Sequence, residues 1–145
     1  MKIIAFVAAI CAITLVFAGY SVKTEDEITI FSETRSFGNG HNKLVNKITT
    51  TPESVFAIEI FSNPTTGYMW KQIKPEKMKC LATNDTKGEG YFVLPTVPKG
   101  KVGVPGKQRF FFTPIQEGHE TLSFEYKRPW QNTSLLLYKV HVTIK

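Results

Sequence analysis

Few side chains in this chain could act as a nucleophile or a general base. The 145 residues contain three histidines, at positions 41, 119 and 141, and two cysteines, Cys11 and Cys80. His141 falls on the outward side of an alternating segment, His119 follows a turn glycine, and no serine or cysteine motif lies beside any histidine. We therefore expect ordinary surface or core histidines, a buried or idle thiol at Cys80, no cofactor, no metal site, and a protein that is not an enzyme.

The sequence instead contains segments suited to binding, and the first of them is a polar turn. The turn reads Asn63-Pro64-Thr65-Thr66-Gly67-Tyr68. Pro64 fixes one φ angle, and Gly67 permits a backbone conformation that other residues adopt only under strain. Thr65 and Thr66 carry hydroxyls that can donate and accept hydrogen bonds. The sequence thus predicts a stiff turn with a polar crest, whose following aromatic residues anchor the next strand in the core.

Two further segments differ from ordinary connectors. Residues 100–107 carry three glycines, so their main chain can approach another surface closely, and Pro105 limits their flexibility. Residues 127–132 place an Arg-Pro-Trp triplet directly after an expected strand, and arginine and tryptophan are enriched at binding hot spots. Each segment could instead be a plain connector, with Trp130 packed as a satellite of the core.

Alternating apolar residues separated by turn signals predict strands through most of the chain. We expect strands at residues 54–61, 68–72, 107–114, 120–126 and 135–144, and a short edge strand near 91–94. The expected inward side chains are Phe56, Ile58, Ile60, Phe110, Phe112, Leu122, Phe124, Tyr126, Leu136, Tyr138, Val140, Val142 and Ile144. This pattern predicts an all-β, immunoglobulin-like antiparallel β-sandwich, in which the three unusual segments lie at one end as a continuous edge.

The first eighteen residues differ from the rest of the chain. Lys2 gives a positive start, and residues 3–17 form an apolar run without charge, which predicts a secretory signal peptide at 1–18. The alternative is a membrane anchor, but the run is shorter than the ~20 residues of a spanning helix. We expect residues 19–42 to be an N-terminal extension, either an extra edge strand or a tail, and residues 43–145 to be the main domain.

Export has consequences for localisation and modification. We expect the protein in the secretory pathway, either in the lumen of lysosome-like vesicles or secreted, and off the membrane once the signal peptide is removed. Asn84 and Asn132 open N-glycosylation sequons and are candidate acceptors. Without the signal peptide only Cys80 remains, so the sequence predicts neither an intramolecular disulfide nor a cysteine-rich metal site.

The charge of the chain favours no polyanionic partner. The formal net charge is +6, and it becomes +5 without residues 1–18, because these contain one lysine and no acidic residue. The basic residues are scattered, as on a solvated surface, and they could speed encounter with an acidic partner. Neither a basic stripe nor a recognisable nucleic-acid-binding module is present, so we do not expect binding to nucleic acid.

Taken together, the three segments resemble the chagasin-type inhibitors of papain-like cysteine proteases. That family has an NPTTG-aromatic loop, a glycine-rich middle loop and an RPW loop, in this order. The matching residues here are Asn63-Pro64-Thr65-Thr66-Gly67-Tyr68, Gly103-Val104-Pro105-Gly106 and Arg128-Pro129-Trp130. The resemblance covers residues 43–145 and implies a reversible, tight-binding inhibitor of cathepsin-type proteases, either the cell's own or foreign. We expect the protein to be a monomer.

The resemblance also implies a role for each loop. The glycine-rich loop, Gly103 to Gly106, would lie across the active-site cleft of the protease as a plug. Thr65 and Thr66 would make polar contacts, and Trp130 would be the aromatic anchor.

Two features depart from the family pattern. Pro105 stands where the family often has glycine, and Gln131 and Asn132 follow the tryptophan, where the family often has one residue and then glycine. A glycan on Asn132 would stand beside the binding edge. The main alternative function is an immunoglobulin-like adhesion or binding module without protease inhibition, because this fold hosts many functions.

Overall fold

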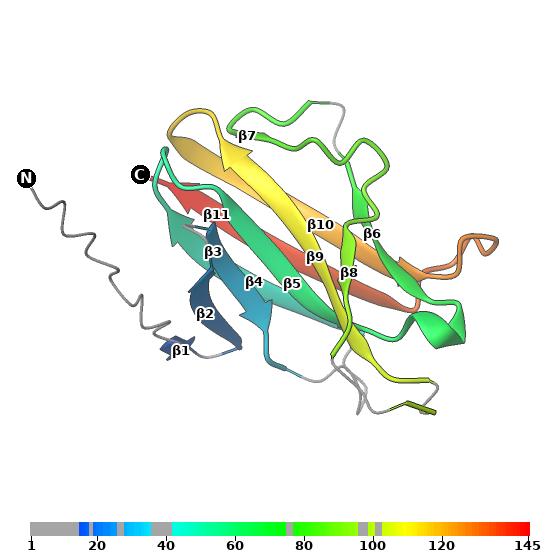
Figure 1. Ribbon diagram of the computed structural model, residues 1–145. Helices are drawn as coiled ribbons and strands as arrows, with labels where there is room; N and C mark the ends of the chain where they lie inside the picture. The colour runs from blue at the N-terminus through cyan, green and yellow to red at the C-terminus, as the bar shows by residue number, and fades with distance from the viewer. Residues whose placement is uncertain are drawn as a thin grey trace, which may run out of the picture.

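The computed structural model describes residues 15–17, 19–25, 28–35, 42–74, 77–95, 99–100 and 103–145. These residues form two β-sheets packed face to face (Figure 1). The strands are β1 (Leu15–Phe17), β2 (Tyr20–Glu25), β3 (Ile28–Glu33), β4 (Lys43–Thr50), β5 (Phe56–Ser62), β6 (Met69–Ile73), β7 (Leu81–Ala82), β8 (Tyr91–Val93), β9 (Gly106–Pro114), β10 (Gly118–Lys127) and β11 (Leu136–Ile144), and a 3₁₀ turn, η1, covers Pro64–Thr66.

The strand order is that of a β-sandwich. Within the described residues, the larger sheet has the order β1-β2-β3-β5-β9-β7, with β8 also paired to β9, and the smaller has the order β4-β11-β10-β6. Most neighbours are antiparallel, but β3 with β5 and β4 with β11 are parallel. The chain crosses to the other sheet through β4 between β3 and β5, which allows these two to point the same way. The expected all-β sandwich is confirmed, with sheets that are mixed in direction.

The core forms where the inward faces of the two sheets meet. The strand periodicity placed these side chains correctly, because Phe56, Ile58, Ile60, Phe110, Phe112, Leu122, Phe124, Tyr138, Val140, Val142 and Ile144 are all buried. Tyr126 and Leu136 pack against this core and are partly exposed. The rings of Phe110 and Phe124 join the two sheets, with centroids 4.7 Å apart.

Residues 19–42 contribute more to the fold than an edge strand. They include β2 and β3, and β3 lies between β2 and β5 in the larger sheet. Ile30 and Phe31 of β3 are buried. Residues 15–17, within the expected signal peptide, form β1 on the outer side of β2, while residues 1–14 and 18 lie outside the described residues. None of the described helical segments has the length and apolarity needed to cross a bilayer.

The strand ends that flank the three unusual segments lie at one end of the sandwich, at the lower right of Figure 1. The register pairs the last residue of β5, Ser62, with the first of β9, Gly106. It also pairs Lys127 of β10 with Met69 of β6, and Tyr126 of β10 with Leu136 of β11. The described residues of the segments 63–68, 100–107 and 127–132 therefore lie at one edge, as the sequence predicts.

Candidate functional site

The turn at residues 63–68 is held by its own hydrogen bonds. The Asn63 side chain caps η1, with Oδ1 accepting from the Thr65 hydroxyl at 2.6 Å and from Thr65 N at 3.3 Å. The Thr66 hydroxyl donates to Asn63 O at 2.8 Å, and Gly67 N donates to Pro64 O at 3.1 Å. Gly67 has φ +79°, in the left-handed region that favours glycine. Both threonines are exposed, so a preformed polar crest faces outward.

The loop at residues 127–132 lies directly against this turn. Arg128 Nε donates to Thr66 O at 3.2 Å. A Cβ atom added at Gly67 would lie only 3.0 Å from Cη2 of Trp130, so the indole reaches over the glycine. Trp130 is nevertheless 72% exposed and Pro129 is exposed too. The alternative of a buried satellite of the core therefore does not hold for Trp130, which offers a large apolar surface to solvent.

The third loop, of which residues 103–105 are described, lies on the other side of the threonine turn from Trp130. Gly103 has φ +74°, and a Cβ atom added there would lie 3.9 Å from Thr65 Oγ1. Val104 is half-buried and Pro105 is exposed, whereas residues 101–102 lie outside the described residues. The three loops thus meet in the order 103–105, 63–68 and 127–132, with the threonine turn in the middle.

Gly106 is placed differently from the rest of the expected plug. It is buried as the first residue of β9, and a Cβ atom there would lie 2.6 Å from Val93 O. A glycine is required at this position because the backbone of β8 crosses so closely. Gly106 therefore forms the base of the loop, and its exposed part consists of Gly103, Val104 and Pro105.

Aromatic stacking holds the turn at 63–68 against the strands beneath it. Tyr68 stacks on Tyr126 with ring centroids 5.4 Å apart, and Trp70 lies against the same tyrosine at 5.0 Å. The Tyr126 hydroxyl accepts from Asn63 N at 3.3 Å. Tyr126 was expected only as an inward strand residue, because its link to the turn depends on two strands that are far apart in sequence.

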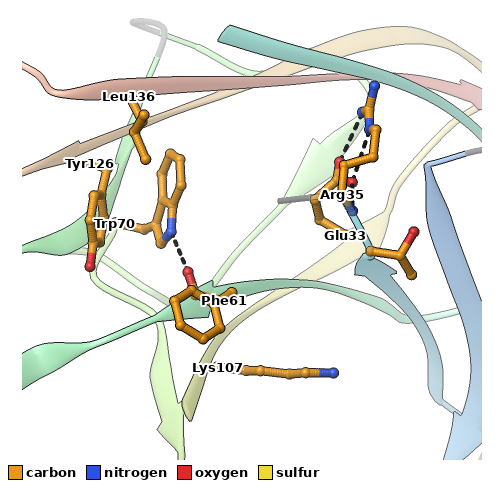
Figure 2. Close-up of a pocket in the computed structure, with 8 residues that line it drawn as sticks. Glu33, Arg35, Phe61, Trp70, Lys107, Tyr126 and Leu136 are labelled. Carbon is orange, nitrogen blue, oxygen red and sulfur yellow. Dashed lines mark hydrogen bonds and ion pairs between the residues drawn. The ribbon is translucent and has the colours of Figure 1, made fainter. Parts of the chain in front are cut away.

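A pocket of about 370 Å³ opens between the sheets beside this base (Figure 2). Its lining is Glu33, Thr34, Arg35, Phe61, Trp70, Lys107, Tyr126 and Leu136. Arg35 Nη2 lies 2.9 Å from Glu33 Oε2, and Trp70 Nε1 donates to Phe61 O at 2.9 Å. The charged and indole groups named here therefore already have partners within the fold.

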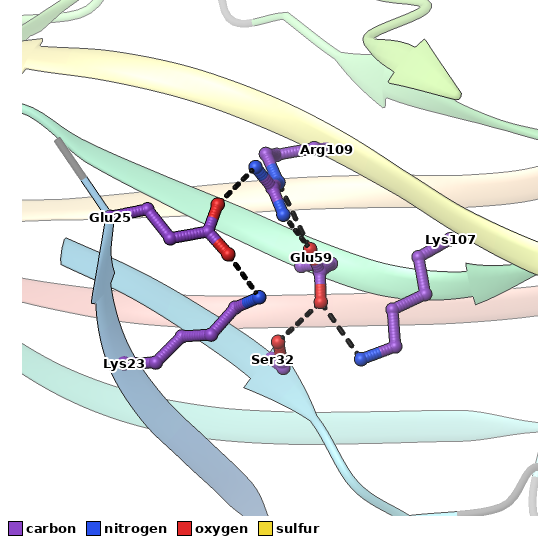
Figure 3. Close-up of polar contacts among 6 residues, drawn as sticks. All are labelled: Lys23, Glu25, Ser32, Glu59, Lys107 and Arg109. Atoms are coloured by element: carbon purple, nitrogen blue, oxygen red, sulfur yellow. Dashed lines mark hydrogen bonds and ion pairs between the residues drawn. The ribbon is translucent and has the colours of Figure 1, made fainter. Parts of the chain in front are cut away.

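A buried carboxylate lies on the outward face of the larger sheet, near the start of β9 (Figure 3). Glu59 accepts hydrogen bonds from Ser32 Oγ at 2.6 Å, Lys107 Nζ at 2.8 Å and Arg109 Nη2 at 2.6 Å. Burial raises the pKa of Glu59, but the hydrogen bonds from Lys107, Ser32 and Arg109 outweigh it and lower this pKa to about 2. The cluster joins β3, β5 and β9 behind the third loop.

The sequence of the domain matches a known family. The family model described as chagasin family peptidase inhibitor I42 matches residues 49–144. The chain belongs to the chagasin family. Amoebiasin-2 of Entamoeba histolytica is 31% identical over 74 residues, which cover 51% of this chain and 55% of that protein. The match therefore spans little more than half the length of this relative.

Two solved structures share the fold. The cysteine protease inhibitor EhICP2 from Entamoeba histolytica has a TM-score of 0.55 and 20% identity, over 74% of this chain and 100% of that one. PbICP-C, solved in complex with falcipain-2, has a TM-score of 0.57 and 17% identity, over 80% of this chain and 98% of that one. At these identities the likeness concerns the fold alone.

In this chagasin-family chain, the cysteine and the two histidines that lie within the described residues are at the opposite end from the three loops. Cys80 is buried near the turn between β9 and β10, with Sγ 3.8 Å from Glu117 O. His119 and His141 are exposed, and their Nδ1 atoms lie 3.2 Å from Thr143 Oγ1 and 3.0 Å from Thr121 Oγ1. His41 lies outside the described residues.

The two sequons differ in their relation to the binding edge. Asn132 is exposed in the same loop as Trp130. Asn84 is also exposed, but it lies beside Thr113 near the C-terminal end of β9, away from the three loops. A glycan on Asn132 would therefore stand next to the edge, and one on Asn84 would not.

Proposed function

We propose that this protein is a reversible, tight-binding inhibitor of papain-like, cathepsin-type cysteine proteases. It occludes the active-site cleft of the protease with residues 63–68, 100–107 and 127–132. The observation that carries the proposal is the convergence of three loops at one edge, which presents an indole, Trp130, that is 72% exposed although it packs over Gly67. An apolar group of this size on a stiff edge is typical of an interface anchor.

Each part of the edge has a role that follows from its chemistry. Trp130 supplies apolar contact area, and the hydroxyls of Thr65 and Thr66, which already donate within the turn, keep lone pairs that can accept from a protease donor. Gly103 to Pro105 enter the cleft, where a thiolate attacks carbonyls of bound peptide. Cleavage requires reacting atoms within ~3.5 Å and aligned, and a loop fixed in another geometry is not cut.

The preformed turn explains why binding would be tight. Side chains and loops that become ordered only on binding each cost free energy, which a rigid edge avoids. The turn at 63–68 is already closed by hydrogen bonds, and Arg128 already fixes it to the next loop. An interface of about 800 Å² per partner is within reach of three such loops.

The comparisons support this proposal. The family whose model matches is one of peptidase inhibitors. PbICP-C was solved in complex with falcipain-2, and EhICP2 is described as a cysteine protease inhibitor. By analogy, we infer the same class of partner for this chain, and a role as an inhibitor that has no catalytic activity of its own. We further propose a monomer that acts in the secretory pathway, in lysosome-like vesicles or outside the cell.

The test is a titration of papain with the protein. The full chain is expressed in a eukaryotic secretory host, its mature N-terminus is determined, and any glycans are removed before the assay. We expect loss of papain activity at near-stoichiometric inhibitor, with trypsin unaffected in parallel, and a product that begins near residue 19. No inhibition of papain or of a panel of related proteases would overturn the proposal and favour an adhesion module. A product that retains residues 1–18 would contradict the signal peptide.

A further inference from the structure

Gln108 is a completely buried amide at the base of the binding edge. It is the third residue of β9 and follows closely on the exposed segment 103–105. In the larger sheet its backbone is paired with Ile60 of β5 on one side and with Phe92 of β8 on the other. Its side chain points across the interior toward β6 of the smaller sheet, so it connects the two layers at the end where the loops begin.

The amide of Gln108 uses its full hydrogen-bonding capacity. Oε1 accepts from Trp70 N at 2.7 Å and from Ser62 Oγ at 3.0 Å. Nε2 donates to Trp70 O at 2.8 Å and to Glu89 O at 2.6 Å. A glutamine amide has two donor hydrogens and two acceptor lone pairs, and each of them has a partner here.

The hydrogen-bond partners of Gln108 lie where the loops leave the strands. Ser62 is the last residue before the turn at 63–68, and Trp70 is the second residue after it. Glu89 leads into β8, which crosses over Gly106 at the base of the third loop. One buried side chain therefore fixes both ends of the threonine turn to the strand from which residues 103–105 extend.

We propose that Gln108 is a positioning residue that sets the spacing between the threonine turn and the plug, and so preorganises the edge before the protease is met. Gln108 does not touch the target itself. Its influence on inhibition rests on the proposed function, whereas its influence on the order of the loops can be measured without a protease. Buried hydrogen-bond networks that are fully satisfied rigidify their surroundings, which is the property a preformed edge needs.

The chain offers a matched control in Gln72. It is also a buried, inward glutamine, on β6, yet among the described residues its Oε1 has no hydrogen-bond partner and its Nε2 lies 3.9 Å from Met78 Sδ. Gln108→Met and Gln72→Met make the same chemical change at two buried positions. Ser62→Ala is a milder variant, because it removes one donor and leaves Trp70 N on Oε1.

Amide hydrogen-exchange rates of the free protein measure how often the threonine turn opens, without any protease present. The amides of Thr66 and Gly67 are bonded within the turn, so they exchange when the turn opens locally. We expect Gln108→Met to speed their exchange by about tenfold relative to wild type, and Gln72→Met to leave it unchanged. Amides in the β10–β11 ladder report global unfolding, and their change in each variant corrects for any loss of overall stability.

Inhibition provides the second readout. We expect Gln108→Met to raise the inhibition constant for papain by about tenfold, with full inhibition still reached at high concentration. Wild-type turn exchange and a wild-type inhibition constant in folded Gln108→Met would overturn the proposal. If Gln108→Met does not fold, Ser62→Ala decides: a smaller increase in both quantities supports the proposal, and wild-type values overturn it. If wild type itself fails to inhibit, the proposed function falls and the exchange comparison alone tests Gln108.

Discussion

The guanidinium of Arg128 lies over the ring of Tyr68, with Cζ 4.5 Å from the ring centroid. The same ring stacks on Tyr126, so Tyr68 contacts both β10 and the loop that follows it. Arg128 also donates to Thr66 O. The arginine is thus engaged in joining the loop at 127–132 to the turn at 63–68, and it supports the edge more than it extends the contact surface.

Arg128→Ala should weaken inhibition of papain by up to about 30-fold, because it removes one cation–π contact and one hydrogen bond, each worth about 1 kcal/mol. Arg128→Lys should recover only part of this loss, since an ammonium lacks the planar guanidinium that stacks on the ring. The inhibition constants of both variants, measured beside wild type, check this. An unchanged constant for Arg128→Ala would show that the two loops hold their places without it.

Gly67→Ala should cost about 1–2 kcal/mol of unfolding free energy, because a Cβ atom is strained at φ +79°. It should also displace the indole, since that Cβ would lie 3.0 Å from Trp130 Cη2. A double-mutant cycle with Trp130→Ala separates the two effects. We expect Gly67→Ala to weaken papain inhibition strongly in wild type and only slightly in the Trp130→Ala background. Equal losses in both backgrounds would mean that the glycine and the indole are not coupled.

The stability contributed by Glu59 should depend on pH. Its pKa is lowered from 4.5 to about 2 in the folded protein, so its contribution is present above pH 4.5 and is lost as pH falls toward 2. Glu59→Gln should therefore cost about 2 kcal/mol of unfolding free energy at pH 7, and clearly less at pH 3. Urea unfolding of wild type and variant at both pH values measures the difference. A cost that is equal at pH 7 and pH 3 would contradict an ionised, stabilising Glu59.

Much of this architecture could be predicted from the sequence because its signals are local. In β11, five apolar side chains alternate with outward residues, and all five lie inward as expected. The conformation of the turn at 63–68 is also determined locally, since Asn63, Pro64 and Gly67 each favour the conformation that they adopt. Once the strands and their order are correct, antiparallel pairing alone brings the three loops to one edge.

Other features could not be predicted because they depend on distant partners. Strand β4 was not indicated, since Asn46 and Thr50 interrupt its apolar face. The buried Asn46 amide is accommodated by hydrogen bonds with distant residues, namely Glu33, Arg35 and Tyr138. Glu59 occupies an outward, polar position, yet it is buried because cations reach it from β9. In the sequence, Gln108 likewise interrupts an apolar strand face. Its role is visible only in the fold, where it bonds Ser62 and Trp70 at the two ends of the turn.

The central claim is that the edge around Trp130 binds the protease, and comparing two exposed apolar residues tests it most directly. Ile115 is 59% exposed between β9 and β10, at the opposite end of the sandwich from Trp130. Inhibition constants for papain are measured for wild type, Trp130→Ala and Ile115→Ala, with urea unfolding to show that both variants are as stable as wild type. We predict an increase of about 30-fold or more for Trp130→Ala, equal to about 2 kcal/mol, and no change for Ile115→Ala. The same inhibition constant for all three proteins would contradict the claim.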